Sequence, residues 1–405
     1  MMRDGARHHI VSSKCNGRSY ICNDYARTDR RGAALFHSGI TGPEATNASQ
    51  PLPTLRAIMA RTIEGYAVHV HMALLPTYVP GKDPPFDAYY QQVLSQVSLA
   101  EELGWECFWF TEHHFILYGG LVPNPAVMMA TAAGRTSRIR LGSSISILPL
   151  HHPLQTAEDY AMVDVASGGR LEFGIGLGNT PADYAHYGIP QEQSRARFEE
   201  AVQIIEQAWS QERFSHHGEM WNLEDVTLFP RPVQQPHPPI WVAGFTPQSL
   251  GWAGRQGYNI MTVAHPRPPE SARAGVQAWC DGLRENGVDR DSRHCQLHVR
   301  IYVDEDSERA RHIAENAIRD YTRLSTARLG DYSTTAIDTY DWEGMRAQGR
   351  NIYGNPDEVI QGIRATMRNF EFDTLTTVCN FGGISHDDIV QSMRLLAREV
   401  LPAFP

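Results

Sequence analysis

Two patterns of hydrophobic and polar positions alternate along the chain from about residue 66. Short apolar runs predict buried strands, whereas apolar residues spaced three or four positions apart predict amphipathic helices. Over residues 195–209, for example, Phe198, Val202, Ile205 and Trp209 fall on one helical face. Strands are predicted at 68–75, 106–110, 139–148, 171–176, 240–243, 260–263, 298–303 and 374–378.

The order of these elements predicts an α/β fold. Most predicted strands are followed by a predicted helix, which implies parallel strands joined by helical crossovers. A doubly wound open sheet would satisfy this alternation, but eight such units favour a closed (β/α)8 TIM barrel. Two segments are too long for ordinary connections, so we expect insertions in the loops at the carboxyl-terminal face of the barrel. We expect residues 212–239 to form a small hairpin and residues 329–351 to form a lid or a surface excursion.

Residues 1–64 differ from the rest of the chain. They are polar, rich in Arg, Ser, Asn and Gly, and follow neither period. A segment of this composition buries too little apolar surface to fold, so we expect a disordered leader over residues 1–64. The barrel domain is then expected over residues 65–405.

Composition excludes several classes of function. The chain has 405 residues and a formal net charge of −10, with 36 Lys and Arg against 46 Asp and Glu, which disfavours a nucleic-acid partner. It lacks an apolar run of about 18 residues, so no membrane span is expected. The first 30 residues carry charges throughout, which disfavours a secretory signal. The six cysteines form no C-x-x-C pair, and we interpret them as reduced thiols of a cytoplasmic protein.

The loop after the second predicted strand carries the first candidate chemistry. It reads Glu112-His113-His114-Phe115 and lies at a strand's carboxyl end, where barrel enzymes place their active sites. A histidine there can transfer protons near neutral pH, and a neighbouring carboxylate can fix its tautomer. The alternative is a histidine pair that only hydrogen-bonds backbone carbonyls. Adjacent histidines in extended chain point to opposite sides and no H-E-x-x-H spacing occurs, so we expect no metal.

Alternate glycines at the end of the fourth predicted strand suggest close approach of another group. Gly174, Gly176 and Gly178 lack a Cβ, so a flat ring could lie against the backbone there; a tight barrel core is the alternative. The spacing is not that of a dinucleotide-binding fingerprint.

The turn after the fifth predicted strand has the pattern of an anion site. Thr246 is a predicted N-cap and Pro247 the first helical residue, so exposed N–H groups at this helix start favour a phosphate. Arg195 could supply the matching charge, or it could be a solvent-exposed helix arginine.

Four segments together resemble the bacterial luciferase-like flavin monooxygenases. They are Glu112 to Phe115; Leu148 to Pro153 followed by Ala157 to Asp159; Asp164 to Gly178; and Tyr353 to Val359. The resemblance runs from about residue 68 to residue 402. At Gly176 and Leu177 the luciferase α subunit has Cys and Arg, so light emission is not expected.

The resemblance implies a (β/α)8 barrel, usually a homodimer, that binds reduced flavin at its mouth. It implies a monooxygenase that uses reduced FMN and O2 to oxygenate a small organic substrate, which we expect to be apolar. A separate NAD(P)H-flavin reductase would supply the FMNH2. Two alternatives are an F420-dependent oxidoreductase that transfers hydride on the same barrel, and a flavin-binding protein without turnover.

The resemblance also assigns residues to roles. His113, with Glu112 beside it, would handle protons next to the flavin, and Arg195 would bind the flavin phosphate. Ser143 and Ser144 would lie beneath the isoalloxazine, at a non-proline cis peptide. The remaining assignments are Gly176, Gly244, Phe245, Thr246 and Ser249 for the cofactor, and Asn124 and Tyr184 for the substrate.

Overall fold

The computed structural model describes residues 61–63, 66–119, 121–265, 268–328 and 340–404. Residues 1–60 and 64–65, most of the expected leader, lie outside the described residues. The other three residues of that segment form β1 (Arg61–Ile63), which pairs antiparallel with the start of the first barrel strand.

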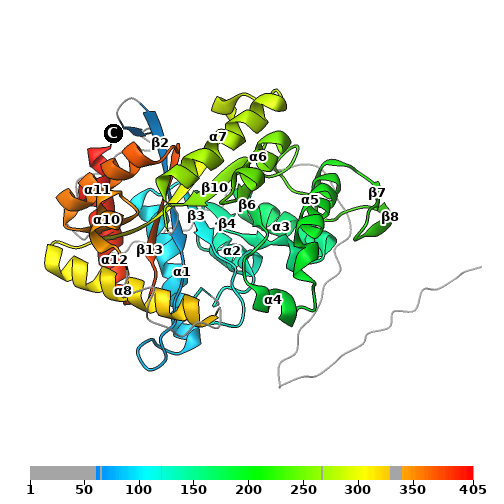
Figure 1. The fold of residues 1–405 in the computed structure, drawn as a ribbon. Coiled ribbons are helices and arrows are strands. Elements are labelled where there is room, and N and C mark those ends of the chain that lie inside the picture. Colours follow the sequence, from blue (N-terminus) through cyan, green and yellow to red (C-terminus); the bar gives the residue numbers. More distant parts are fainter. Residues whose placement is uncertain (1–60, 64–65, 120, 266–267, 329–339, 405) are drawn as a thin grey trace, which may run out of the picture. The chain divides into compact units, whose positions relative to one another are not determined.

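The eight predicted strands form a closed parallel barrel, which confirms the predicted TIM-barrel fold (Figure 1). Each strand pairs in parallel with its two neighbours, and the last strand pairs with the first, so the sheet closes on itself. The barrel strands are β2 (Tyr66–Leu74), β3 (Cys107–Phe110), β4 (Arg140–Ser143), β6 (Leu171–Gly176), β9 (Ile240–Ala243), β10 (Asn259–Val263), β11 (Cys295–Val303) and β13 (Thr374–Asn380).

Burial on both faces explains why these strands read as continuous apolar runs. Every residue of β3, β6 and β13 is buried, because helices cover the outside of the barrel and side chains fill its inside. Figure 1 shows the helices arranged around the central strands. They are α1 (Phe86–Leu103), α2 (Pro125–Ala133), α3 (Pro153–Ser167), α4 (Pro181–His186), α5 (Ser194–Ser210), α6 (Pro247–Gln256), α7 (Pro269–Glu285), α8 (Ser307–Arg328), α10 (Trp342–Ala347), α11 (Pro356–Asn369) and α12 (His386–Leu395).

Local sequence signals explain several helix boundaries. The predicted apolar stripe of α5 is buried. Helix α11 begins with a capping box, in which Asn355 and Glu358 each accept a hydrogen bond from the other's backbone N–H. Helix α3 ends at Gly168, whose φ of +69° is a left-handed conformation that glycine adopts without strain.

The third predicted strand is divided in two. It consists of β4 and β5 (Ser146–Ile147), and the peptide bond between Ser144 and Ile145 separates them in the cis conformation that the resemblance implied. The break arises because β4 pairs with the start of β6, whereas β5 pairs with its end, at Ile175 and Gly176.

The two predicted insertions have different outcomes. Residues 212–239 contain the expected hairpin, formed by β7 (Phe214–His217) and β8 (Asn222–Val226). Of residues 329–351, the first eleven, 329–339, lie outside the described residues, and the rest contain α10 and the start of β12 (Asn351–Gly354). No described helix combines the length and the apolar character needed to cross a bilayer.

Strand β12 changes the barrel on one side. It pairs in parallel with the second half of β11, whereas β13 pairs with the first half. Arg300 lies at the changeover, opposite Asn351 on one side and Val378 on the other. Strands β12 and β13 therefore lie on opposite sides of β11, and β12 follows β10 along its side of β11 towards the carboxyl end.

Candidate functional site

A cavity of about 520 Å³ lies at the carboxyl ends of the barrel strands. Every barrel strand, or the loop that follows it, contributes to its lining, as expected for a site at the mouth of a TIM barrel. The lining includes Leu74, Thr111, Glu112, His113, Ser144, Ile145, Leu177, Gly178, Gly244, Phe245, Thr246, Ser249, Val263, His265, His298, Arg300, Arg350 and Val378. Two tyrosines, Tyr118 and Tyr321, and Asp183 also line it.

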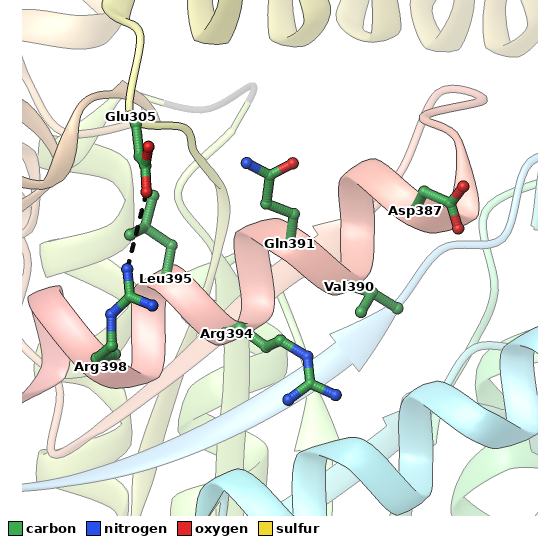
Figure 2. Close-up of a pocket in the computed structure, with 7 residues that line it drawn as sticks. All are labelled: Glu305, Asp387, Val390, Gln391, Arg394, Leu395 and Arg398. Carbon is green, nitrogen blue, oxygen red and sulfur yellow. Dashed lines mark ion pairs between the residues drawn. The ribbon is translucent and has the colours of Figure 1, made fainter.

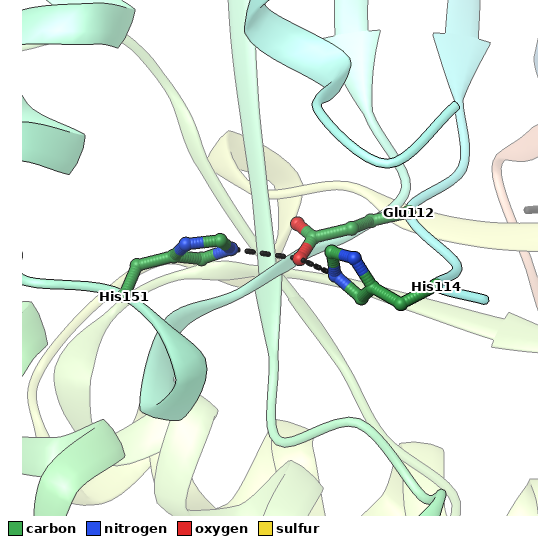
Figure 3. A group of neighbouring side chains, drawn as sticks. All are labelled: Glu112, His114 and His151. Atoms are coloured by element: carbon green, nitrogen blue, oxygen red, sulfur yellow. Dashed lines mark hydrogen bonds and ion pairs between the residues drawn. The ribbon is translucent and has the colours of Figure 1, made fainter. Parts of the chain in front are cut away.

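Glu112 lies between two histidines at the wall of this cavity (Figure 3). Its Oε1 atom lies 2.9 Å from Nε2 of His114 and 2.7 Å from Nε2 of His151. Its Oε2 atom accepts the backbone N–H of Ile147 at 3.0 Å, which ties the loop after β3 to β5. Because a carboxylate only accepts, both imidazoles donate to it through Nε2.

Burial and these hydrogen bonds act in opposite directions on the ionisation of the group. Burial favours the neutral acid, but hydrogen bonds from His114 and His151 outweigh it and lower the pKa of Glu112. For His151, burial favours the neutral imidazole, but the hydrogen bond and charge of Glu112 raise its pKa. Glu112 is therefore an ionised carboxylate held between two histidines.

The expected contact between a histidine of this loop and its neighbouring carboxylate is found at His114. The Glu112 carboxylate binds His114, His151 and the Ile147 amide. Glu112 and His113 both line the cavity, whereas His114 is buried behind Glu112, outside the lining. The Nδ1 atom of His114 lies 3.1 Å from the Tyr187 hydroxyl, so both ring nitrogens are engaged.

Residue types alone would allow a metal at this cluster. The ligand atoms of Glu112, His114 and His151 lie within 4.8 Å of one another, and two histidines with one carboxylate are a known metal-binding set. Hydrogen bonds account for the arrangement without an ion, since the imidazoles donate to the carboxylate directly. The absence of a metal remains a prediction.

His113 lies beside a close backbone approach. Its ring lies 5.3 Å from that of Tyr118, centroid to centroid, and both line the cavity. Gly119 has a φ of +64°, and a Cβ built on it would lie 2.3 Å from Cδ2 of His113. The glycine is therefore required both by the backbone conformation and by the position of the imidazole.

A second group of polar atoms gathers where α6 begins. Thr246 caps this helix, its hydroxyl oxygen accepting the N–H of Ser249 at 3.2 Å. Arg195, at the start of α5, donates from Nη2 to the Ser249 hydroxyl at 2.9 Å. Thr246 and Ser249 line the cavity together with Gly244 and Phe245, and Arg195 reaches them from outside the lining. The structure thus brings together five of the predicted cofactor-binding residues.

The glycines of β6 lie close to the chain that connects β4 and β5. A Cβ on Gly174 would lie 1.8 Å from the Ser143 carbonyl oxygen, and one on Gly176 would lie 2.3 Å from Cδ1 of Ile145. The chain between β4 and β5 thus packs against both glycines, as in a tight core, and the role of Gly176 towards a cofactor stays a prediction. Ile145 covers Gly176 and itself lines the cavity.

The two predicted serines separate into a structural position and a position that lines the cavity. The Ser143 hydroxyl is buried, donates to the Gly174 carbonyl oxygen at 2.8 Å and accepts the Gly174 N–H at 3.0 Å. It joins β4 to β6 rather than facing the cavity. Ser144, the next residue, lines the cavity.

The two predicted substrate-binding residues lie away from the described lining. Asn124 is exposed, and its side chain caps α2 by accepting the N–H of Val127 at 3.2 Å. Tyr184 is buried with Ile147 and Leu150, and its hydroxyl donates to the Leu177 carbonyl. Both side chains therefore stabilise the loops around the cavity.

Several polar lining residues were missed from the sequence, among them Thr111, His298, Arg300 and Arg350. The Oγ1 atom of Thr111 and the Nε2 atom of His298 are buried, and neither has a hydrogen-bond partner in the part of the chain that the structure describes. For His298 and Arg300 a signal existed. They alternate with Val299 and Ile301, and in a barrel strand a polar residue at every second position points to one side.

A second hollow, of about 350 Å³, lies along α12 (Figure 2). Its lining residues are Glu305, Asp387, Val390, Gln391, Arg394, Leu395 and Arg398. Arg398 forms a 3.9 Å ion pair with Glu305, and both are exposed. Surface ion pairs of this kind contribute little to stability. Among the described residues that line this hollow, no group of buried polar side chains comes together. We place the functional site at the barrel mouth.

The fold and the site together define a TIM-barrel protein with a ligand site at its carboxyl-terminal mouth. The family model described as luciferase-like monooxygenase matches residues 70–374. The chain belongs to this luciferase-like monooxygenase family.

Individual relatives are similar over most of their length. The chain is 36% identical over 320 residues to the uncharacterized protein y4vJ of Sinorhizobium fredii, covering 76% of this chain and 90% of the relative. It is 28% identical over 338 residues to the oxygenase component of the flavin-dependent trigonelline monooxygenase of Acinetobacter baylyi, covering 78% and 90%. Among solved structures, monooxygenase RslO1 from Streptomyces bottropensis has a TM-score of 0.76 at 29% identity, covering 83% of this chain and 100% of that one.

Proposed function

We propose that the protein is a flavin-dependent monooxygenase that uses reduced FMN and O2 to oxygenate a small organic substrate in the cavity at the barrel mouth. The observation that carries the proposal is the group formed by Arg195, Thr246 and Ser249 at the start of α6. Membership of the luciferase-like monooxygenase family supports it.

This group fits the phosphate of FMN by its chemistry. Two hydroxyls and a guanidinium meet at a helix N-terminus, where backbone N–H groups and the helix dipole also favour an anion. A built Cβ on Gly244 would lie 2.6 Å from Leu250, so the turn is as compact as a backbone cradle requires. Bound reduced FMN would supply two electrons to O2. One oxygen atom would enter the substrate and the other would leave as water.

The chain's own residues would orient the reactants, exclude water and move a proton. His113, on the cavity wall, is proposed to carry that proton at an imidazole nitrogen. Leu74, Ile145, Leu177 and Val378 give the cavity apolar walls that limit water. Glu112 is proposed to act as a positioning residue, since it joins the loops after β3 and β4.

The supply of reduced flavin is also part of the proposal. The Acinetobacter relative is named an oxygenase component, which supports a separate NAD(P)H-flavin reductase as partner. A homodimer and a cytoplasmic location, both expected from the sequence, belong to the same proposal.

Removing the guanidinium tests the phosphate site. We expect Arg195→Ala to weaken FMN binding about 10- to 100-fold, because a charge-assisted hydrogen bond contributes about 1.5–3 kcal/mol. Riboflavin, which lacks the phosphate, should bind equally to both proteins. Fluorescence titration measures both affinities. Arg255→Ala, in the last turn of the same helix and half-exposed, is the control and should change neither. Equal losses for FMN and riboflavin would contradict the assignment.

Cofactor choice and turnover need separate measurements. Anaerobic titration with FMNH2 and with reduced F420 compares the two cofactors directly, and F420 alone binding would favour the hydride-transfer alternative. Mixing the FMNH2 complex with oxygenated buffer and following flavin absorbance tests oxygen activation. Reoxidation at the rate of free FMNH2, without product in a substrate screen, would favour flavin binding without turnover.

Gly119 offers a test of the position of His113. We expect Gly119→Ala to lose about 1 kcal/mol of stability, because φ is positive there, and also to displace the imidazole and lower coupled turnover. Gly104→Ala is a matched control, since Gly104 has a φ of +91° and no atom within 4 Å of a built Cβ. Chemical denaturation should show similar losses of stability in both variants. Product assays should show a reduced product yield only in Gly119→Ala. Equal yields in both variants would contradict the role of Gly119.

A further inference from the structure

The cavity has a second cationic region, formed by Arg300 on β11 and Arg350 just before β12. His265, just after β10, lies beside Arg300, and all three residues line the cavity. We propose that Arg300, with Arg350 beside it, binds the carboxylate of an organic acid, so that the substrate is a monocarboxylate with a flat apolar body. This inference rests on the proposed function and names the substrate class of the same site.

Arg300 is a buried cation without a counter-charge in the described structure. Arg300 is 9% exposed. Its guanidinium lies 3.9 Å from the centroid of the Tyr321 ring, and its Nη1 atom lies 3.4 Å from Nδ1 of His265. No carboxylate of the described residues lies within ion-pair distance of it, although Glu112 and Asp183 line the same cavity. Burying an unpaired charge is costly, and the cation–π contact offsets only part of that cost. A bound anion would complete the site.

The other polar groups of this region are a second buried arginine and two histidines. Arg350 is 8% exposed and donates from Nε to the Ala264 carbonyl at 3.1 Å, which holds its guanidinium beside the β10 loop. Burial lowers the pKa of His265 to about 2, with the charges of Arg300 and Arg350 adding to the effect, so this imidazole is neutral. The buried Nε2 atom of His298, two residues before Arg300 on the same side of β11, also lacks a partner in the described chain.

The path from Arg300 to His113 suits a flat apolar body. The Tyr321 ring beneath Arg300 lies 4.6 Å from the Tyr118 ring, and the Tyr118 ring lies 5.3 Å from His113. An acid anchored by its carboxylate at Arg300 would lie along these rings, with its far end next to His113. The apolar substrate expected from the sequence is thereby refined to an apolar body that carries an anionic group.

This cationic region is separate from the proposed phosphate site. Arg195 is hydrogen-bonded to Ser249 at the start of α6. Arg300 instead contacts His265, which follows β10, and Tyr321, which lies on α8. The two cations are therefore expected to respond to different parts of the bound molecules.

Binding of matched acids and amides tests the inference without turnover. The FMN-loaded protein is titrated calorimetrically with benzoate, phenylacetate, nicotinate, cyclohexanecarboxylate and octanoate, each beside its primary amide. We expect at least one acid to bind at least about tenfold more tightly than its amide, the effect of one charge-assisted hydrogen bond. If no acid binds more tightly than its amide, the inference is overturned.

Variants assign the preference to Arg300. Arg300→Gln should remove the difference between acid and amide while FMN affinity stays as in the wild type, and Arg300→Lys should restore part of it. Arg398→Gln, on the exposed surface of the barrel, is the control and should keep the full preference. FMN binding by Arg300→Gln shows that this variant is folded, and a preference that survives in it overturns the inference.

Two further outcomes separate this inference from the proposed function. A selective loss of FMN over riboflavin in Arg300→Gln would place Arg300 at the cofactor phosphate and overturn the inference, while FMN binding itself stands. Acid-selective binding without oxygen consumption would support the carboxylate site and contradict the monooxygenase.

Discussion

Replacing His113 with alanine is expected to lower the yield of oxygenated product per O2 consumed by about 100-fold or more. A positioned proton-transfer group contributes about 10²- to 10⁴-fold to a reaction, and His113 is the imidazole that lines the cavity beside the aromatic rings. FMN should still bind, because the proposed phosphate group lies on α5 and α6. Oxygen should still be consumed, but hydrogen peroxide should replace product.

The measurement pairs an oxygen electrode with peroxide and product assays, using a substrate found in the screens above. His217→Ala is a suitable control, because the His217 side chain is 64% exposed on the β7–β8 hairpin. It should leave product yield unchanged. A normal product yield in His113→Ala would remove His113 from the chemistry.

Replacing Glu112 with glutamine is expected to lower the free energy of unfolding by about 3 kcal/mol near pH 5.5. Removing the charge from a buried, hydrogen-bonded pair is among the costliest single changes, and Glu112 joins His114, His151 and the Ile147 amide. Glutamine has nearly the same size, so the loss reports on charge rather than on packing. Chemical denaturation measures it.

The pH dependence of this loss follows from the two pKa shifts. The lowered pKa of Glu112 contributes stability above the ordinary value of 4.5, and that contribution is lost as pH falls through the folded value. The raised pKa of His151 contributes stability below the ordinary value of 6.5, and that contribution is lost as pH rises through its folded value. The difference between wild type and Glu112→Gln should therefore be largest between pH 4.5 and 6.5.

An exposed carboxylate provides the comparison. Glu285→Gln changes a side chain that is 62% exposed, and the variant should differ from the wild type by less than about 0.5 kcal/mol at any pH. A Glu112→Gln variant with the same small, pH-independent effect would show that the carboxylate is not ionised between its histidines.

The proposed site divides its tasks among separate parts of the barrel. The start of α6 is proposed to bind the phosphate, and His113 to transfer the proton. The region around Arg300 is proposed to bind the substrate anion. Glu112 lies outside these three tasks and holds the connecting loops together. Because each part has its own expected readout, the four assignments can fail independently.

Much of the fold was predictable from local pattern. Strand and helix periods depend on neighbours in sequence, so the eight barrel strands, the stripe of α5 and the cap at Thr246 were all readable. Closure of the barrel followed from the alternation of these elements. The break at Ser144–Ile145 was expected only from the family resemblance, because no periodicity marks it.

The contacts of individual side chains were not predictable from the sequence. Gly174 and Gly176 were read as room for a ring, and the structure packs the chain between β4 and β5 against them. Asn124 and Tyr184 were assigned to the substrate, but they bond to α2 and to the Leu177 carbonyl. The neighbours of the two glycines lie on another segment, whereas Val127 and Leu177 lie three and seven residues from Asn124 and Tyr184. Sequence periodicity specifies neither which segments pack together nor which side chains bond within their own loop.

The sequence by itself determined the type and order of the elements, and therefore which residues lie at the carboxyl ends of strands. Period and capping are short-range properties, and they place Glu112, His113 and Thr246 at the barrel mouth. Only the tertiary structure decided which groups meet there. Glu112 binds His151, which is 39 residues away, and Arg300 and Arg350 share one end of the cavity although 50 residues separate them. Such contacts depend on how the barrel closes and how its loops pack, so they form only when the whole chain has folded.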